Sequence, residues 1–369
     1  MIEGLFIPHS TNDKPEYWMM QQKNTFQTGT QIKYVLKIRA ILRELPMFCS
    51  AFFRSIENNT SVLTRYAYAI DLRGFFYYLI SEPELFLGRD LLSLTAIDLE
   101  KIQACHIEMY LDQMTLYYKD EREFTNKQQA KARKLCTLRS FFKFCFKQEL
   151  LSSNVASLVD LPKLHEKAIV RLEPNEVANL LDTAERGDGL SLRQKQYHNV
   201  TKLRDLAILT LFLGTGIRIS ELVGIDLIDV DFENDAFSVT RKGGSQDILT
   251  FGNEVHDAMK EYYDWRALQI TVSGHEQAFF LSMQMKRISV RAVEILVKKY
   301  ATLATPLKKI TPHKLRSTYG TMLYHETQDI YLVADVLGHK DVNTTRKHYA
   351  ASSEENKRIA AKKIKLRDD

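Results

Sequence analysis

Apolar side chains recur at helical spacing along two long segments, and this periodicity constrains the fold more than any other feature. One segment covers residues 60–81, where Thr60 or Ser61 can cap the first turn. The other covers residues 125–151, and its predicted buried stripe consists of Leu135, Leu138, Phe142, Cys145 and Phe146. We therefore expect a mainly helical protein.

As far as Gln148, every charged residue of the second segment is basic. Between Thr125 and Gln148 the chain carries seven lysine and arginine residues and no aspartate or glutamate. Solvated helix faces usually mix both signs, so this face favours contact with a phosphate backbone, although a merely solvated charged face remains the alternative. The residues that we expect to bind DNA are Lys127, Lys131, Arg133, Lys134 and Arg139.

The length of 369 residues exceeds that of one ordinary hydrophobic core and predicts two domains. Residues 161–177 break the helical pattern with Pro162 and Pro174, which indicates a linker. We therefore divide the chain into an N-terminal extension at 1–39, a helical domain at 40–164, a linker at 165–172 and a second domain at 173–369.

Composition argues against several classes of protein. No stretch approaches about eighteen uninterrupted apolar residues, as a membrane span requires, and Glu3 with a short apolar run is unlike a secretory signal. The four cysteines form no CxxC pair, as in a reduced cytoplasmic protein without a zinc site. Residues 229–235, "DVDFEND", lack the glycine and the later glutamate of a calcium loop. We expect no metal and no cofactor.

Two stretches in the second half predict the framework of a site. Residues 204–225, "RDLAILTLFLGTGIRISELVGI", predict a buried helix, a glycine turn with Arg218, and a second helix. The glycines do not match the GxGxxG pattern of a nucleotide-binding turn. Residues 236–252, "AFSVTRKGGSQDILTFG", predict two short strands joined by a Gly-Gly turn. A small antiparallel sheet should therefore accompany the helices.

A candidate anion site follows at "TPHKLRSTYG". Thr311 suits an N-cap and Pro312 suits the first helical position, so a helix should begin here. His313 and Arg316 then lie on one face of the first turn, where helix N-termini attract phosphate. A capped helix whose histidine and arginine only face water remains the alternative.

Residues 337–350, "LGHKDVNTTRKHYA", repeat this design. A helix should end at Gly338, His339 follows it, and a basic segment leads to Tyr349. A single tyrosine on a helix usually belongs to a core or an interface. Tyr349 becomes a candidate nucleophile only if an anion site lies within its reach.

Taken together, these residues resemble the tyrosine recombinase (phage integrase, Xer-like) family. The resemblance covers Glu173 to Tyr349 and extends more weakly to the helices of the first half. It implies a two-domain DNA clamp, in which a SAM-like helical core-binding domain and a catalytic domain with a small sheet enclose double-stranded DNA. The catalytic set that the resemblance carries over, in chain order, is Arg218, Lys242, His313, Arg316, His339 and Tyr349.

The resemblance also implies the chemistry. Tyr349 would attack the scissile phosphate and leave a 3′-phosphotyrosine and a free 5′-hydroxyl, without metal or ATP. Arg218 and Arg316 would clamp the non-bridging oxygens, and Lys242 would protonate the departing 5′-oxygen. For the remaining two residues, the family implies that His313 assists proton transfer at the tyrosine and that His339 binds the phosphate.

The chain departs from many relatives in two places. The turn after Lys242 reads "GGSQD" and lacks their further basic residues, and ten positions rather than nine separate His339 from Tyr349. The tail at 355–369 keeps Ile359, Ala360 and Ile364 at helical spacing. In relatives such a helix docks on a neighbouring protomer, which implies a homo-tetramer on DNA, although a solvated basic tail remains the alternative.

The expected function is site-specific recombination at defined DNA sites, for integration or excision of a mobile element or for resolution of chromosome dimers. The expected location is cytoplasmic and associated with the nucleoid, and an accessory protein is an optional further partner. A type IB topoisomerase, which shares the tyrosine chemistry, is the main alternative. A catalytically silent DNA-binding protein is disfavoured because every member of the catalytic set is present in the sequence.

Overall fold

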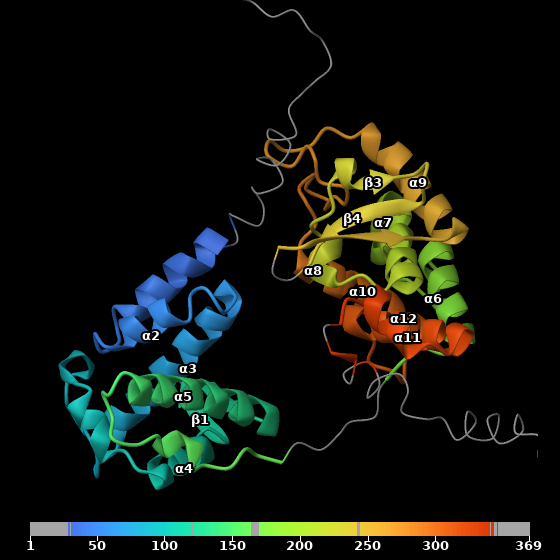
Figure 1. The fold of residues 1–369 in the computed structure, drawn as a ribbon. Helices are drawn as coiled ribbons and strands as arrows, with labels where there is room; N and C mark the ends of the chain where they lie inside the picture. Colours follow the sequence, from blue (N-terminus) through green and yellow to red (C-terminus); the bar gives the residue numbers. More distant parts are fainter. Residues whose placement is uncertain are drawn as a thin grey trace, which may run out of the picture. The chain divides into compact units, whose positions relative to one another are not determined.

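The computed structural model describes residues 29, 31–119, 122–163, 170–241, 244–339, 341, 342 and 345, with 118 and 119 described by their backbone only. The chain divides into two compact units, Met1–Lys167 and Ala168–Asp369, each with its own hydrophobic core (Figure 1). Both are mainly helical, and each contains a small antiparallel sheet. The predicted fold class is therefore confirmed. Within the described ranges no helix has the length and apolar character needed to cross a membrane.

The first unit consists of helices around a cluster of aromatic rings. Phe75 and Phe142 meet edge to face with ring centroids 6.2 Å apart, and Phe76 and Phe141 do so at 5.9 Å, so these rings join the third and fifth helices. The elements are a helix at 31–42, α2 (Cys49–Ser55), α3 (Val62–Ser81), η1 (Leu91–Ser93), η2 (Ile97–Lys101), α4 (Ala104–Gln113), β1 (Leu116–Lys119), β2 (Arg122–Thr125), α5 (Gln128–Lys147) and η3 (Val155–Ser157).

Helices α3 and α5 correspond to the two periodic segments. Ser61 rather than Thr60 caps α3, because its hydroxyl accepts the backbone N–H of Thr64 at 3.2 Å. Phe146 is 47% exposed, so its assignment to the buried stripe of α5 is wrong. Helical spacing does place Phe146 in line with the stripe, four residues after Phe142, but it stands in the last turn of α5, which ends at Lys147, and there its ring stays exposed. The other four predicted members are buried: Leu135, Leu138, Phe142 and Cys145.

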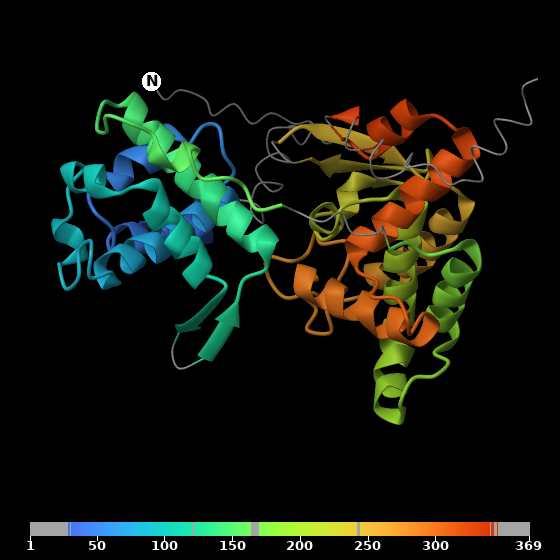
Figure 2. The same ribbon diagram turned by 90° about the horizontal axis from the view of Figure 1, so that it is seen from below.

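A hairpin that the sequence did not predict connects α4 to α5. Its strands β1 and β2 pair antiparallel with Leu116 opposite Thr125, and the rings of Tyr117 and Phe124 stack at 5.5 Å. Figure 2 shows this hairpin standing out from the helices of its unit. All four β2 side chains are exposed, so no buried alternation marks the strand in the sequence.

The second unit is organised around α7 (Leu192–Thr215), which contacts α6, α9 and α11. Val170 and Leu172, residues of the expected linker, pack on the core of this unit. The other helices are α6 (Pro174–Arg186), α8 (Ile219–Leu222), η4 (Leu227–Asp229), α9 (Asn253–Ala267), α10 (Val290–Ala304), α11 (Pro312–Thr327) and α12 (Ile330–Val336).

One three-stranded antiparallel sheet lies beside these helices, in the order β3 (Val230–Asp231), β4 (Ala236–Thr240) and β5 (Gln246–Thr250). Strands β4 and β5 are the hairpin predicted at 236–252, with Thr240 opposite Gln246. The sequence "DVDFEND" ends η4, forms β3 and makes the turn that precedes β4.

Candidate active site

The end of α7 approaches α11 and α12 so closely that only glycine fits there. Gly216 follows the helix with a left-handed φ of +62°, and a Cβ on it would lie 2.4 Å from a ring carbon of Tyr319 and 2.8 Å from Leu337. Its carbonyl oxygen accepts a hydrogen bond from Nη1 of Arg316 at 2.5 Å. This close approach brings Arg218, two residues further on, beside Arg316 of α11.

The guanidinium groups of Arg218 and Arg316 converge on one acceptor. Nη2 of Arg218 donates to the carbonyl oxygens of Leu337 at 3.2 Å and Gly338 at 3.0 Å. Nη2 of Arg316 also donates to the Leu337 carbonyl. Arg316 is buried, whereas the Arg218 side chain keeps 32% of its surface exposed. The two arginines expected to hold a phosphate therefore lie side by side, at the carbonyls of the two residues that precede His339 in the chain.

Glu221 orients Arg218 and was missed in the sequence. It is buried, and its carboxylate accepts Nη1 of Arg218 at 2.8 Å and the Arg218 backbone N–H at 3.0 Å. A carboxylate three residues after an arginine at a helix start is the spacing of a capping box, and that signal could have identified the pair. Charge-assisted bonds of this kind fix the direction of the guanidinium.

A third guanidinium, from Arg241 in the β4–β5 turn, completes the cluster and was also missed. Arg241 is buried, and its Nη2 donates to the Val336 carbonyl at 3.2 Å. Its Nη1 lies 3.4 Å from Oε2 of Glu221, and its Nε donates to Asp247 on β5 at 2.9 Å. Arg241 directly precedes Lys242, which lies outside the described residues.

Three consecutive carbonyls, beginning with that of the last residue of α12, thus receive three guanidinium groups. Arg241 donates to Val336, Arg316 to Leu337, and Arg218 to Leu337 and Gly338. The C-terminal end of a helix carries partial negative charge, which stabilises cations placed there. Two carboxylates, of Glu221 and Asp247, oppose the three positive charges. The cluster therefore retains the positive charge that binding of a phosphate requires.

The two histidines of the expected set stand on segments that also contribute to this cluster: His313 on α11 with Arg316, and His339 directly after Gly338. His313 is exposed in the first turn of α11, which begins at Pro312 as predicted, although no side-chain hydrogen bond caps it from Thr311. Nδ1 of His339 lies 2.8 Å from the hydroxyl of Thr345, and its backbone N–H donates to Ala334. Tyr349, the expected nucleophile, lies outside the described residues.

The basic face of α5 differs from its prediction. Lys134 is buried, and its Nζ lies 3.2 Å from Oδ1 of Asp71 on α3, so its assignment to an exposed face is wrong. Arg133 donates to the same carboxylate at 2.9 Å while its side chain stays 48% exposed. A buried carboxylate requires a paired cation, which explains why α5 turns these residues towards α3.

The other three residues of that face have mixed environments. Arg139 donates to the backbone carbonyls of Ala156 and Val159, so its guanidinium fastens α5 to η3. Lys131 is half-buried and donates to the hydroxyl of Thr115 at 2.8 Å. Lys127 is exposed. The basic run in the sequence therefore serves both the fold of the first unit and its surface charge.

Comparisons with known proteins agree on one family. Residues 170–356 match the Phage integrase family. The chain is 30% identical over 294 residues to tyrosine recombinase XerC of Thermodesulfovibrio yellowstonii, covering 79% of this chain and 86% of that one. It is 33% identical over 292 residues to XerC of Caldanaerobacter subterraneus subsp. tengcongensis, covering 76% and 75% respectively.

The fold comparison agrees with the sequence comparison. The crystal structure of the XerH site-specific recombinase bound to palindromic difH substrate superposes with a TM-score of 0.62 at 20% identity, covering 82% of this chain and 80% of that one. The relatives are recombinases, so the topoisomerase alternative is not favoured. The chain belongs to the phage integrase family and is a site-specific tyrosine recombinase, an enzyme that cleaves and rejoins DNA.

Proposed function

We propose that this recombinase binds double-stranded DNA at specific recombination sites and cleaves it with Tyr349 as the nucleophile. The convergence of Arg218 and Arg316 on the Leu337 carbonyl carries the proposal, because it sets two guanidinium forks at one place, next to His339. Arginine suits a phosphate because it stays charged and donates in a fixed geometry.

In the reaction, the Tyr349 oxygen forms a bond to phosphorus while the bond from phosphorus to the 5′-oxygen breaks. Arg218 and Arg316 neutralise the charge that develops on the non-bridging oxygens, and the burial of Arg316 strengthens that interaction. His313 takes part in moving the tyrosine proton, and His339 donates to the phosphate. Lys242 gives a proton to the 5′-oxygen.

The phosphotyrosine linkage conserves the phosphoester bond. Attack by a 5′-hydroxyl of another strand reverses the steps, so rejoining needs no ATP. The substrates of solved neighbours support DNA as the partner: the XerH structure contains palindromic difH, and the Tn1549 integrase structure contains circular intermediate DNA. On the first unit we assign contacts with the DNA backbone to Lys127, Lys131 and Arg133, which are wholly or partly exposed.

The proposal includes the oligomeric state of the enzyme on DNA. A homo-tetramer on DNA, joined through the tail at 355–369, would place two pairs of active sites on two recombining duplexes, and an accessory protein could select the pairing. The enzyme would act at the nucleoid if the recombination site is chromosomal. Integration of a mobile element and resolution of chromosome dimers both use this chemistry.

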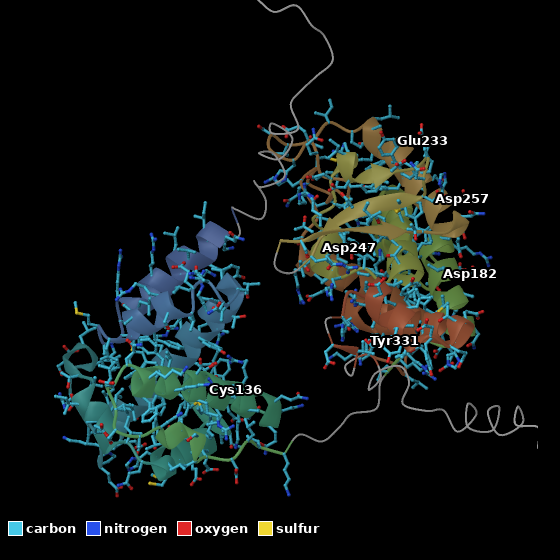
Figure 3. All side chains as sticks on the ribbon, viewed as in Figure 1. Cys136, Asp182, Glu233, Asp247, Asp257 and Tyr331 are labelled. Carbon is cyan, nitrogen blue, oxygen red and sulfur yellow. The ribbon has the colours of Figure 1, made fainter. Side chains whose placement is uncertain are left out.

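Covalent capture tests the nucleophile. Sheared genomic DNA of the host is mixed with the protein, and detergent then denatures the protein. The DNA that remains covalently attached to it is sequenced. Wild type should retain fragments that share one site, whereas Tyr349→Phe should retain none, because phenylalanine has no oxygen to bond phosphorus. Tyr331→Phe is the matched control, since Tyr331 is an exposed tyrosine on α12 (Figure 3) and should leave capture unchanged.

Two results would contradict the proposal. Capture by Tyr349→Phe at the wild-type level would show that another residue is the nucleophile. Captured fragments with no common sequence would show that the enzyme does not act at a specific site. The common site also supplies the duplex used in the experiments that follow.

A further inference from the structure

Arg241 is unusual among hairpin-turn residues because its charged side chain is buried. Turns normally lie on the surface, where water satisfies their polar groups. Arg241 instead keeps only 9% of its surface exposed, and burial of an unpaired charge would be costly. Its guanidinium is paired with carboxylates from both sides, Glu221 and Asp247, and with the Val336 carbonyl.

These partners belong to three different parts of the second unit. Glu221 lies on α8 and also holds Arg218, Val336 ends α12, and Asp247 lies on β5. A planar fork can bond several acceptors in fixed directions, which the point charge of a lysine cannot do. The Arg241 side chain therefore connects the β4–β5 turn to α8, whose Glu221 orients Arg218, and to the end of α12, which leads to His339.

The backbone around Arg241 is held as well. Its N–H donates to the carbonyl of Ser245 at 2.8 Å, and the N–H of Gly244 donates to the carbonyl of Arg241 at 3.0 Å. The guanidinium also lies against Gly338, where a Cβ would come within 2.9 Å of the Arg241 Cζ. Both the main chain and the side chain of Arg241 are thus fixed relative to the phosphate-binding arginines.

Lys242 is the next residue in the chain. Consecutive Cα atoms across a trans peptide are about 3.8 Å apart, so fixing one residue constrains where the next can lie. We propose that Arg241 is a positioning residue for leaving-group protonation: by anchoring the turn, it sets where the Lys242 ammonium meets the departing 5′-oxygen. The inference rests on the general-acid role proposed above for Lys242. Arg241 itself does not touch the reacting atoms.

A sulfur-containing substrate separates this role from a general structural one. In a nicked duplex of the captured site, sulfur replaces the bridging 5′-oxygen of the scissile phosphate. The phosphorus–sulfur bond then breaks to release a thiolate, which needs no proton because thiols have a pKa of about 8.5, far below that of an alcohol. A variant that fails only in delivering the proton should therefore recover on the sulfur substrate.

Lys242→Ala should cleave the oxygen substrate about 10²–10⁴-fold more slowly than wild type and approach the wild-type rate on sulfur. Arg241→Met should lose about 10–10²-fold on oxygen, because a displacement of about 1 Å carries a penalty of that size, and should recover on sulfur. Arg241→Lys should behave like Arg241→Met, since the charge alone does not anchor the turn.

Two further variants distinguish a defect in positioning Lys242 from a defect in folding. Arg266→Met removes another buried guanidinium, which donates to the carbonyls of Glu276 and Ala278, away from the site residues; any loss it causes should be equal on both substrates. Asp247→Asn removes one anchor of Arg241 at an exposed side chain, so the fold should survive. It should slow oxygen cleavage several-fold and leave sulfur cleavage unchanged.

The inference is overturned if Arg241→Met and Asp247→Asn cleave the oxygen substrate at the wild-type rate. It is also overturned if their losses are equal on oxygen and sulfur, as expected for damage to the fold or to phosphate binding. Failure of sulfur to rescue Lys242→Ala is a different result. It would refute the general-acid role itself, and the inference would be refuted with it.

Discussion

Two separate features of the site require glycine at position 338: the backbone conformation and the contact with Arg241. Its φ of +59° lies in the left-handed region, which side chains with a Cβ rarely adopt. The space that a Cβ would occupy is filled by the Arg241 guanidinium at 2.9 Å. Glycine here therefore permits both the turn after α12 and the contact with Arg241.

Gly338→Ala should destabilise the second unit and slow DNA cleavage. The backbone conformation alone should cost about 1–2 kcal/mol, and displacement of Arg241 should add to that. Gly274→Ala separates the two effects, because Gly274 also has a positive φ, of +84°, but no atom lies within 4 Å of where its Cβ would be. Urea unfolding and covalent capture measure the two outcomes. Equal destabilisation by both substitutions would show that the Arg241 contact is unimportant.

At the scale of elements, a buried ion cluster joins α7 to α10. Asp205 is buried on α7 and accepts Nζ of Lys299 and the hydroxyl of Tyr300, both on α10, at 2.9 Å each, while Arg204 binds its other oxygen. Burial raises the pKa of Asp205, but the positive charges and hydrogen bonds of Arg204 and Lys299 outweigh it and hold the pKa below its ordinary value.

Asp205→Asn should reduce the free energy of unfolding by about 3–5 kcal/mol near neutral pH, because it leaves the cations without this carboxylate. The folded-state pKa is lowered, so the stabilisation is fully present above about pH 4 and disappears as the pH falls through the folded-state pKa. The difference between wild type and variant should therefore shrink on acidification. Urea unfolding from pH 7 to pH 3 tests this.

Asp182→Asn provides the control for that series. Asp182 is exposed on α6 and lies 3.8 Å from Arg186 one turn later, so its removal should change stability by less than about 1 kcal/mol at any pH (Figure 3). An Asp205→Asn variant as stable as Asp182→Asn, or a difference that grows on acidification, would contradict the role assigned to the ion cluster.

At the scale of the whole molecule, the chain separates into two units, and every described residue of the candidate active site lies in the second. Arg218, Arg241 and Arg316 supply three positive charges within one cluster. Cations of this kind can perform the charge neutralisation that nucleases obtain from bound metal ions. The first unit contributes exposed basic residues of α5.

Cleavage should therefore proceed in EDTA at the rate seen in magnesium at matched ionic strength. The measurement is formation of the covalent adduct on a nicked duplex of the captured site, with both conditions followed over time. Matched ionic strength matters because salt weakens contacts with the DNA backbone independently of the chemistry. A strict requirement for magnesium would contradict an arginine-based mechanism.

The boundaries of α3, the start of α11 and the β4–β5 hairpin were predictable because caps, prolines, glycine turns and helical spacing act within a few residues. The same local signals identified Arg218, His313, Arg316 and His339 as candidates. They failed for Phe146, which helical spacing places in the buried stripe although its ring is exposed, and for the β1–β2 hairpin, where all four β2 side chains are exposed and show no alternation.

The sequence by itself determined the helical class of this protein, the order of its candidate catalytic residues and, through that order, its family resemblance. Only the tertiary structure decided which charges meet: Glu221 with Arg218 and Arg241, Lys134 with Asp71, and three arginines at the end of α12. The reason is physical. Helical periodicity depends on neighbours along the chain, whereas a buried charge takes its partner from whichever element packs across it.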